Sequence, residues 1–200
     1  MKYYAVRQGR QVGIFTDWNE CKRLVTGYKG AEYKGFTSRD DAVAFLEGAV
    51  PPSNESVEPS ADTVVAYVDG SYNVKTKAFA CGVVLLLDGG EEKRMNERFE
   101  DAELATMRNV AGEIKGSMMA IQYCLEHEIS KLHLFYDYEG IEKWCTGAWK
   151  TNKTGTIAYK QFYDMAKTQV DIVFHKVKGH SGDQYNDLAD RLAKDAAGIE

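Results

Sequence analysis

The chain is divided by one short segment. All three of its prolines lie in AVPPSNESVEPSAD, residues 49–62, whose other positions are mostly Ser, Asn and acidic residues. A proline-rich polar stretch without apolar periodicity is typical of an extended linker, and structureless runs of this length are uncommon inside a compact domain. The alternative is a long loop within one domain. We favour the linker, which predicts a small domain over 1–48 and a larger one over 63–200.

Net charge is distributed unevenly over these two parts. The whole chain has a formal net charge of −5, which by itself argues against a nucleic-acid binder. Residues 1–39, however, contain eight Lys and Arg against three Asp and Glu, a local balance of +5, so the other 161 residues carry −10. A basic module joined to an acidic one suggests a part that binds phosphate groups and a part that needs carboxylates.

The cysteines and the apolar residues indicate a cellular compartment. The four cysteines form no C-x-x-C pair and have no zinc-like spacing, so we interpret them as buried thiols in a reducing environment. The start, MKYYAVRQGR, lacks the apolar core of a signal peptide, and no stretch approaches the ~18 apolar residues of a membrane span. We therefore expect a soluble cytoplasmic protein with no membrane partner.

The first 48 residues show the pattern of a small ββαβα domain. KYYAVRQGRQVGIF is expected to form two short strands, and GAEYKGF a third. Thr16 or Asp17 can cap a helix from about Trp18 to Val25, and Ser38 is expected to cap a last helix. A domain of this size has a thin core, so its aromatic residues should be partly exposed.

The larger domain shows strands first, and then strands that alternate with helices. VVAYVDG (64–70) is nearly all apolar, as expected for a central strand that is covered on both faces. Further strands are predicted over 79–87, 91–100, 131–137 and 171–178, and helices over about 110–128, 156–168 and 184–197, with a short helix through Ile141 and Trp144. This order predicts an α/β fold in which a mixed five-stranded sheet has helices on both faces.

Four acidic residues come from four different elements of the larger domain. Asp69 is expected to end its first strand and Asp137 its fourth, while Glu113 lies early in the helix between them and Asp190 in the last helix. The first and fourth strands should be parallel neighbours. Asp69 and Asp137 would then emerge at the same carboxyl edge of the sheet, where open α/β folds bind their ligands.

Carboxylates that converge in a partly buried site are costly unless they are neutralised. A hard divalent cation with oxygen ligands, Mg²⁺ or Mn²⁺, is the usual remedy. The alternative is that each acid caps a turn or faces solvent. An acid that closes an apolar central strand, as Asp69 is expected to do, favours a metal site, but residue spacing alone leaves both possibilities open.

Four segments of the larger domain, taken in order, resemble the catalytic segments of type 1 ribonuclease H: YVDGSYN, NVAGEIKGSMMAI, FYDYEGIEKW and KGHSGDQYNDLADRLAK. The resemblance spans 63–200. Residues 1–48 are similar to the hybrid-binding domain of the family through YYAVRQGRQVGIFTDWNEC and YKGF. The resemblance implies an endonuclease that hydrolyses the RNA strand of RNA–DNA hybrids, with the hybrid as its partner and a catalytic domain that is monomeric.

The resemblance also implies which residues carry the chemistry. The metal-binding acids of the family fall on Asp69, Glu113, Asp137 and Asp190, and its mobile catalytic histidine falls on His180. Two Mg²⁺ ions, or Mn²⁺ in their place, would then leave 5′-phosphate and 3′-hydroxyl ends. The near-neutral pKa of a histidine suits His180 for proton transfer or for release of metal and product. Asp187 shares a helix face with Asp190, and the motif favours Asp190.

Contacts to the hybrid are predicted in both domains. Near the acids, polar groups are candidates for contact with 2′-hydroxyls: Ser71, Asn73 and Asn109. In residues 1–48, the family positions that hold the DNA strand fall on Tyr4, Trp18, Tyr33 and Lys34. Alternatively, Ser71 and Asn73 are plain turn residues, and Trp18 and Tyr33 form the core of the small domain. Glu139 departs from the Gln often found at this position in the family, which leaves its role open.

Two other functions were weighed. A binding module with an inactive nuclease fold would hold hybrids without cutting them, but all four acids are present. Another nuclease or an integrase of the same fold would not account for the His180 segment or for the hybrid-binding domain. Both alternatives are therefore disfavoured.

Overall fold

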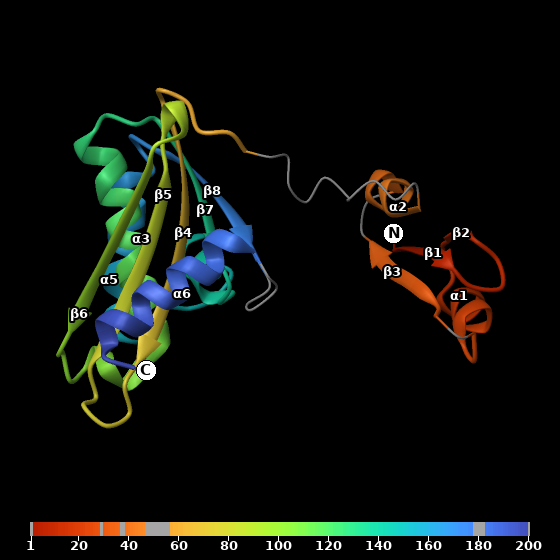
Figure 1. Ribbon diagram of the computed structural model, residues 1–200, viewed down its shortest axis with the longest axis horizontal. Helices are drawn as coiled ribbons and strands as arrows, with labels where there is room; N and C mark the ends of the chain where they lie inside the picture. The colour runs from red at the N-terminus through yellow and green to blue at the C-terminus, as the bar shows by residue number, and fades with distance from the viewer. Residues whose placement is uncertain (1, 29, 37–38, 47–56, 178–182, 200) are drawn as a thin grey trace. The chain divides into compact units, whose positions relative to one another are not determined.

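The chain consists of two compact units, Met1–Ser56 and Val57–Glu200 (Figure 1). The computed structural model describes residues 2–28, 30–36, 39–46, 57–177 and 183–199. No helix within these ranges is long and apolar enough to cross a membrane.

The first unit is a three-stranded antiparallel sheet with two helices. Its strand order is β2-β1-β3. Its elements are β1 (Tyr3–Gln8), β2 (Gly13–Phe15), α1 (Trp18–Val25), β3 (Glu32–Phe36) and α2 (Arg39–Leu46). The predicted ββαβα order is confirmed.

Local interactions explain where α1 begins and what it covers. The carboxylate of Asp17 accepts the backbone N–H of Asn19 at 2.8 Å and so satisfies one of the free donors at the helix N-terminus. The small core of the unit consists of Val6, Phe15, Cys21 and Val25. The predicted cap of the last helix, Ser38, lies outside the described residues.

The second unit is a mixed sheet of the order β6-β5-β4-β7-β8. Its strands are β4 (Thr63–Tyr72), β5 (Phe79–Leu86), β6 (Glu92–Phe99), β7 (Lys131–Tyr136) and β8 (Asp171–Lys176). Its helices are α3 (Asn109–Glu126), α4 (Gly140–Cys145), α5 (Thr154–Ala166) and α6 (Gln184–Ala197), with 3-10 turns at Asp88–Gly90 and Leu104–Met107. The first three strands pair antiparallel, and β4, β7 and β8 pair parallel. The predicted fold is confirmed.

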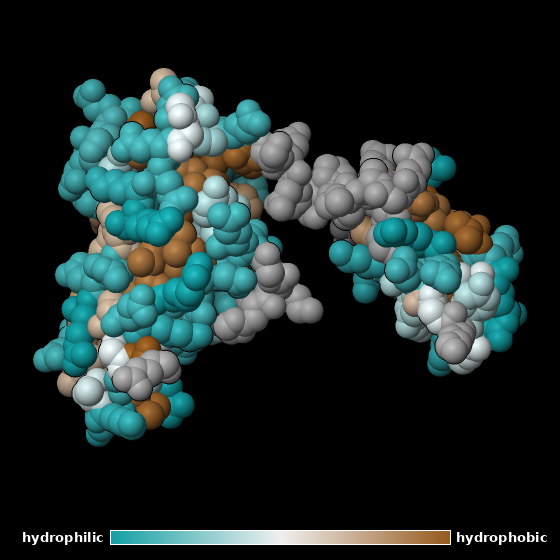
Figure 2. Space-filling view, in the orientation of Figure 1, coloured by the Kyte–Doolittle hydropathy of each residue, from teal (hydrophilic) through white to brown (hydrophobic). Residues whose placement is uncertain are grey.

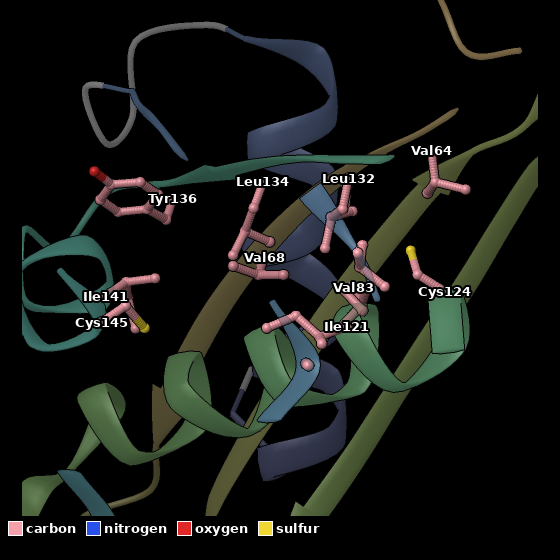
Figure 3. Close-up of a cluster of buried hydrophobic side chains, with 14 of the residues drawn as sticks. Val64, Val68, Val83, Ile121, Cys124, Leu132, Leu134, Tyr136, Ile141 and Cys145 are labelled. Carbon is pink, nitrogen blue, oxygen red and sulfur yellow. The ribbon is translucent and has the colours of Figure 1, made fainter. Parts of the chain in front are cut away.

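Helices cover both faces of this sheet. Val64, Ala66 and Val68 of β4 pack into the larger core with α3, whereas Val65 and Tyr67 pack on the face that carries α6. Figure 3 shows how side chains from β4, β5, β7, α3 and α4 meet in the larger core. Burial on both faces explains why the sequence of β4 is apolar without alternation.

The face that carries α6 is only partly closed. Figure 2 shows this face, where apolar atoms remain visible between hydrophilic side chains. Tyr185, Leu188 and Leu192 of α6 are partly buried against the sheet. At one edge of the sheet, β6 is mostly exposed and charged.

The strand β4 extends further than the sequence predicts. The prediction that this strand ends at Asp69 is wrong, because the pairing of β4 with β5 continues to the pair Tyr72 and Phe79. Only the pairing with β7 stops earlier, at Tyr67 and Phe135. Asp69 therefore lies on a strand segment that is paired on one side and open on the other.

Two glycines let α3 approach β4 and β5 closely. A Cβ atom on Gly70 would lie 2.0 Å from the backbone oxygen of Asn109, and one on Gly112 would lie 2.0 Å from the backbone oxygen of Ala80. No real Cβ contact is that short, so only glycine fits at either position. The first turn of α3 consequently lies backbone to backbone against the sheet.

A third glycine does the same for α6. A Cβ atom on Gly82 of β5 would lie 2.0 Å from the backbone oxygen of Ala189 and 2.7 Å from the backbone nitrogen of Ala193. The middle of α6 therefore rests directly on β5.

Gly112→Ala should destabilise the protein by about 2–3 kcal/mol, because overpacking against backbone cannot be relieved by a side-chain movement. The matched control is Gly116→Ala, one turn later on α3. There the new Cβ would meet side-chain atoms of Cys81 and Val83 at 3.3 and 3.4 Å, and alanine adds about 1 kcal/mol of helix propensity. Urea unfolding measures both variants. Equal stability of the two would disprove the close approach of α3.

Candidate active site

Asp69 and Asp137 lie side by side at the carboxyl edge of the parallel strands. The last pair of the β4–β7 ladder is Tyr67 with Phe135; Asp69 follows two residues later on β4, and Asp137 comes directly after the last residue of β7. Asp69 therefore points to the same side of the sheet as Tyr67. Burial, followed by the charge of Asp137, raises the pKa of Asp69 to about 7, as expected for two carboxylates that share a site.

Glu113 joins this pair from α3. Its side chain is 2% exposed, and its Oε1 accepts the backbone N–H groups of Asp137 at 3.1 Å and Tyr138 at 3.2 Å. Burial raises its pKa well above the usual value, the charges of Asp137 and Asp69 add to this, and the two N–H donors oppose it. Glu113 thus ties the start of α3 to the end of β7.

Asp190 reaches the site from the opposite face of the sheet. Gly82, on which α6 rests, is the cross-strand partner of Asp69. The charge of Asp190 is among those that raise the pKa of Asp69. Its carboxylate accepts from the ammonium group of Lys194 at 2.6 Å. The structure therefore brings the four predicted acids together from four elements.

The donor set fits divalent cations. All four groups offer oxygen atoms, which are the ligands that Mg²⁺ and Mn²⁺ prefer. Burial, and then the charge of Asp137, raise the pKa values of Asp69 and Glu113, and a bound cation would favour their ionised forms. Within the described ranges, no three His, Cys, Asp or Glu side chains are arranged to hold a metal ion as they stand. Instead, Asp69 accepts from the Gly70 N–H, Glu113 from two backbone N–H groups and Asp190 from Lys194.

The polar residues beside the acids occupy three different settings. The Asn73 amide donates to the carbonyl oxygens of Ala197 and Gly198, both at 3.0 Å, so it fastens the turn after β4 to the end of α6. Ser71 is buried within β4. Asn109 is exposed in the first turn of α3. All three stay predicted hybrid contacts, and Asn73 has a structural role as well.

Glu139, whose role the sequence leaves open, is bound to two lysines. Its carboxylate accepts from Lys143 and from Lys176. The hydrogen bond from Lys143, and then that from Lys176, lower the pKa of Glu139 to about 2. The side chain is therefore ionised and already engaged.

The histidines differ in what the structure shows of them. His180 lies outside the described residues, so its catalytic role stays a prediction. His133 Nδ1 and His175 Nε2 lie 2.8 Å apart, and the His175 ring stacks on Phe135. His127 Nδ1 lies 2.9 Å from the backbone oxygen of Tyr123 at the end of α3. The three rings therefore have partners within the fold.

In the first unit, the predicted hybrid contacts form an exposed aromatic row. Trp18 lies between Tyr4 and Tyr33, with ring centroids 5.2 and 6.0 Å apart. Trp18 and Tyr33 are 40% and 45% exposed, so the alternative that they form the core of the small domain is wrong. Lys34 is exposed next to Tyr33. The row is an accessible surface on which sugars or bases can stack.

A groove beside the acids contains residues that sequence reasoning missed. It is lined chiefly by Arg108, Asn109, Tyr138, Trp144, Lys150 and Lys153. Arg108 precedes α3 with φ 54° and ψ −132°, a backbone conformation that residues other than glycine rarely adopt. Nothing in the sequence indicates that conformation. Three cationic side chains and two aromatic rings make the groove a candidate path for a nucleic-acid strand.

Family models match both units. One, described as the ribonuclease H1 N-terminal domain, matches residues 2–46, and another, described as RNase H, matches residues 61–198. The chain belongs to the ribonuclease H family. Its second unit is a ribonuclease H domain, and the prediction of a type 1 enzyme with the N-terminal domain of that family is confirmed. Ribonucleases H hydrolyse RNA in RNA–DNA hybrids.

Relatives and solved structures agree with this assignment. Ribonuclease H1 of Homo sapiens is 28% identical over 98% of this chain and 89% of its own length. RNase H1 of the archaeon Halobacterium salinarum NRC-1 covers 68% of this chain and 98% of its own, with a TM-score of 0.56 and 24% identity. LC11-RNase H1, solved in complex with an RNA/DNA hybrid, covers 68% of this chain and 96% of its own, with a TM-score of 0.55 and 16% identity. The two structures support the fold of the ribonuclease H domain.

The carboxylate cluster should make stability depend on pH when no metal is bound. Because the folded-state pKa of Asp69 is about 7 against an ordinary value of 3.8, the folded state binds more protons than the unfolded state between these values. The free energy of unfolding should therefore fall as pH rises from about 4 to about 7. In EDTA, Asp69→Asn should raise Tm near pH 7.5 and have little effect near pH 4.5.

Thermal unfolding by circular dichroism measures this difference at both pH values. Mg²⁺ should raise Tm of the wild type more than that of Asp69→Asn, because the variant has lost an oxygen ligand with full charge. A Tm difference between wild type and variant that is the same at both pH values would contradict a repulsive cluster.

Proposed function

We propose that the chain cleaves the RNA strand of RNA–DNA hybrids at the cluster formed by Asp69, Glu113, Asp137 and Asp190. The observation that carries this proposal is the convergence of four carboxylates from β4, α3, β7 and α6 at one edge of the sheet. The raised pKa values of Asp69 and Glu113 support it, since they reflect burial of both groups and then the charge of the neighbouring Asp137.

The four carboxylates would hold two divalent cations, Mg²⁺ in the first place and Mn²⁺ as the alternative. When bound, the cations would activate a water for attack on the scissile phosphate and stabilise the leaving oxygen, which gives 5′-phosphate and 3′-hydroxyl ends. The chain itself supplies preorganised ligands. Glu113 is fixed by two backbone N–H groups, and Asp69 by a strand that is paired with β5. His180 is proposed to transfer protons or to assist release of product.

Residues around the cluster are proposed to hold the hybrid. Arg108 and Asn109 both line the groove beside the cluster. Contacts between cationic side chains such as Arg108 and backbone phosphates supply most of the affinity for nucleic acid. The row formed by Trp18 and Tyr33, with Lys34 beside it, is proposed to bind the DNA strand. We accordingly assign hybrid binding to 1–48, tethering to 49–62, of which the part from Val57 on packs with the second unit, and catalysis to 63–200.

Cleavage is tested with a labelled RNA–DNA hybrid, a DNA duplex and an RNA duplex of one sequence, first with Mg²⁺ and then with EDTA. We expect cutting of the hybrid alone, in its RNA strand, and only with the metal. Cleavage of the DNA duplex, or undiminished cleavage in EDTA, would refute the proposed function. Mapping of the product ends tests the predicted 5′-phosphate and 3′-hydroxyl groups.

Asp69→Asn and Asp190→Asn should each lower the rate of hybrid cleavage to less than about a hundredth of wild type, because each removes a charged metal ligand. Affinity for the hybrid, measured in EDTA, should stay within a few-fold, since it comes mainly from phosphate contacts elsewhere. The matched control is Asp187→Asn, three residues before Asp190 on α6, which should keep most of the activity. If Asp187→Asn were inactive and Asp190→Asn active, the metal ligand on α6 would be Asp187 and not Asp190.

Deletion of the first unit should leave a catalytic domain that still cuts. The deletion should end at Ser56, because Val57 packs on the second core and the Asp62 carbonyl oxygen accepts the N–H groups of Ser130 and Lys131. We expect weaker binding, a smaller salt dependence and fewer cuts per encounter on long hybrids, with less change on short ones, because a tethered module raises the local concentration of substrate.

The full-length double variant Trp18→Ala with Lys34→Ala serves as the control for this deletion. It removes the proposed hybrid contacts and keeps the chain length, so it should reproduce much of the loss. A truncated protein that binds and cuts long hybrids as well as the full chain would show that residues 1–48 serve another partner.

A further inference from the structure

Three charged side chains form a compact cluster at the carboxyl edge of the sheet. The Glu139 carboxylate accepts hydrogen bonds from the ammonium group of Lys143 and, at 2.7 Å, from that of Lys176. Lys143 lies one helical turn after Glu139, whereas Lys176 ends β8, 37 residues further along the chain. We refer to Glu139, Lys143 and Lys176 as the lysine–carboxylate cluster.

The cluster lies next to the proposed cleavage site. Glu139 follows Asp137 by two residues, and Lys176 pairs with Tyr136 in the β7–β8 ladder. The ammonium group of Lys143 lies 4.9 Å from the centroid of the Trp149 ring, and Trp149 in turn contacts Tyr138, which lines the groove described above. Trp149 and Tyr138 therefore connect Lys143 to the groove, and Glu139 joins Lys176 to Lys143.

The charges within the cluster are not balanced. Two ammonium groups share one carboxylate, which leaves a net positive charge. All three side chains are between 37% and 46% exposed, so a ligand can reach them from solvent. Exposed ion pairs of this kind contribute little to stability. A phosphate group, which carries the same charge as the carboxylate, can therefore take its place at low cost.

We propose that Lys143 and Lys176 form a binding site for a backbone phosphate of the hybrid, and that Glu139 occupies this site as a built-in competitor when no nucleic acid is bound. The proposal rests on the proposed function, since it names a part of the same substrate surface. Its consequence is weaker binding of every polyanion, which favours release of the cut product. Glu139 then acts on affinity through the two lysines and does not contact the substrate itself.

The chain provides a matched control for this arrangement. Asp164 likewise accepts hydrogen bonds from two lysines, Lys160 and Lys167. It lies near the end of α5, just before β8 begins at Asp171, and so at the edge of the sheet opposite to Lys176. Asp164→Asn changes the net charge as Glu139→Gln does and also releases two lysines, but away from the proposed substrate path.

The experiment measures binding of full-length protein to a short labelled hybrid in EDTA, by fluorescence anisotropy over a series of salt concentrations. At low salt, Glu139→Gln should tighten binding by about three- to ten-fold and make the slope of log Kd against log salt steeper by about one to two, since each freed lysine can neutralise a phosphate. Asp164→Asn should change Kd by less than about two-fold under the same conditions. Wild-type cleavage with Mg²⁺ is measured in parallel.

A second set of variants isolates the lysines. Lys143→Met with Lys176→Met should weaken binding, and adding Glu139→Gln to this pair should have no further effect, because the competitor then has nothing to mask. This set tests the proposal even if Glu139→Gln alone lowers Tm.

Three results would overturn the proposal. The first is that Glu139→Gln binds the hybrid as the wild type does or more weakly. The second is that Asp164→Asn raises affinity for the hybrid as much as Glu139→Gln does. The third is that Glu139→Gln still raises affinity when both lysines are replaced. If the wild type cuts hybrids while any of these holds, only the phosphate site fails. If the wild type neither binds nor cuts hybrids, the proposed function fails first.

Discussion

The ribonuclease H domain depends on the direct contact of helix backbone with strand backbone at three glycines. At Gly70, Gly112 and Gly82, any Cβ atom would lie 2.0 Å from a backbone oxygen. Closely packed interiors cannot absorb such an overlap without movement of whole elements. The distances of α3 and α6 from the sheet are thereby fixed, and the positions of Glu113 and Asp190 follow from them.

This constraint explains how repelling groups come to share one site. α3 and α6 lie on opposite faces of the sheet, and each is anchored close to Asp69, through Gly70 on one side and Gly82 on the other. The packing of two apolar faces supplies the free energy that holds the carboxylates together. The acids oppose folding when they are ionised, and the core outweighs them. The same cores that stabilise the fold thus hold four carboxyl groups together at one site.

Much of this organisation could be predicted from the sequence. Apolar runs and the turn residues between them predicted the elements and their order, and the parallel pairing of the first and fourth strands predicted that Asp69 and Asp137 emerge at one edge of the sheet. The continuation of β4 past Asp69 could not be predicted, because pairing with β5 over Gly70 to Tyr72 depends on a hairpin partner. The positive φ of Arg108 and the bond between Glu139 and Lys176 depend on tertiary contacts that leave no local pattern.

The open edge at β6 bears on how the protein behaves at high concentration. A strand at the edge of a sheet presents unpaired N–H and C=O groups on which a strand from another molecule can add. In β6, Lys93, Arg94, Glu97 and Arg98 are exposed, with charges of both signs along the strand. An incoming strand would have to desolvate these charges and match their order. The charged side chains of β6 therefore protect the sheet from aggregation by strand addition, and this protection does not require a helix or a further strand to cover the edge.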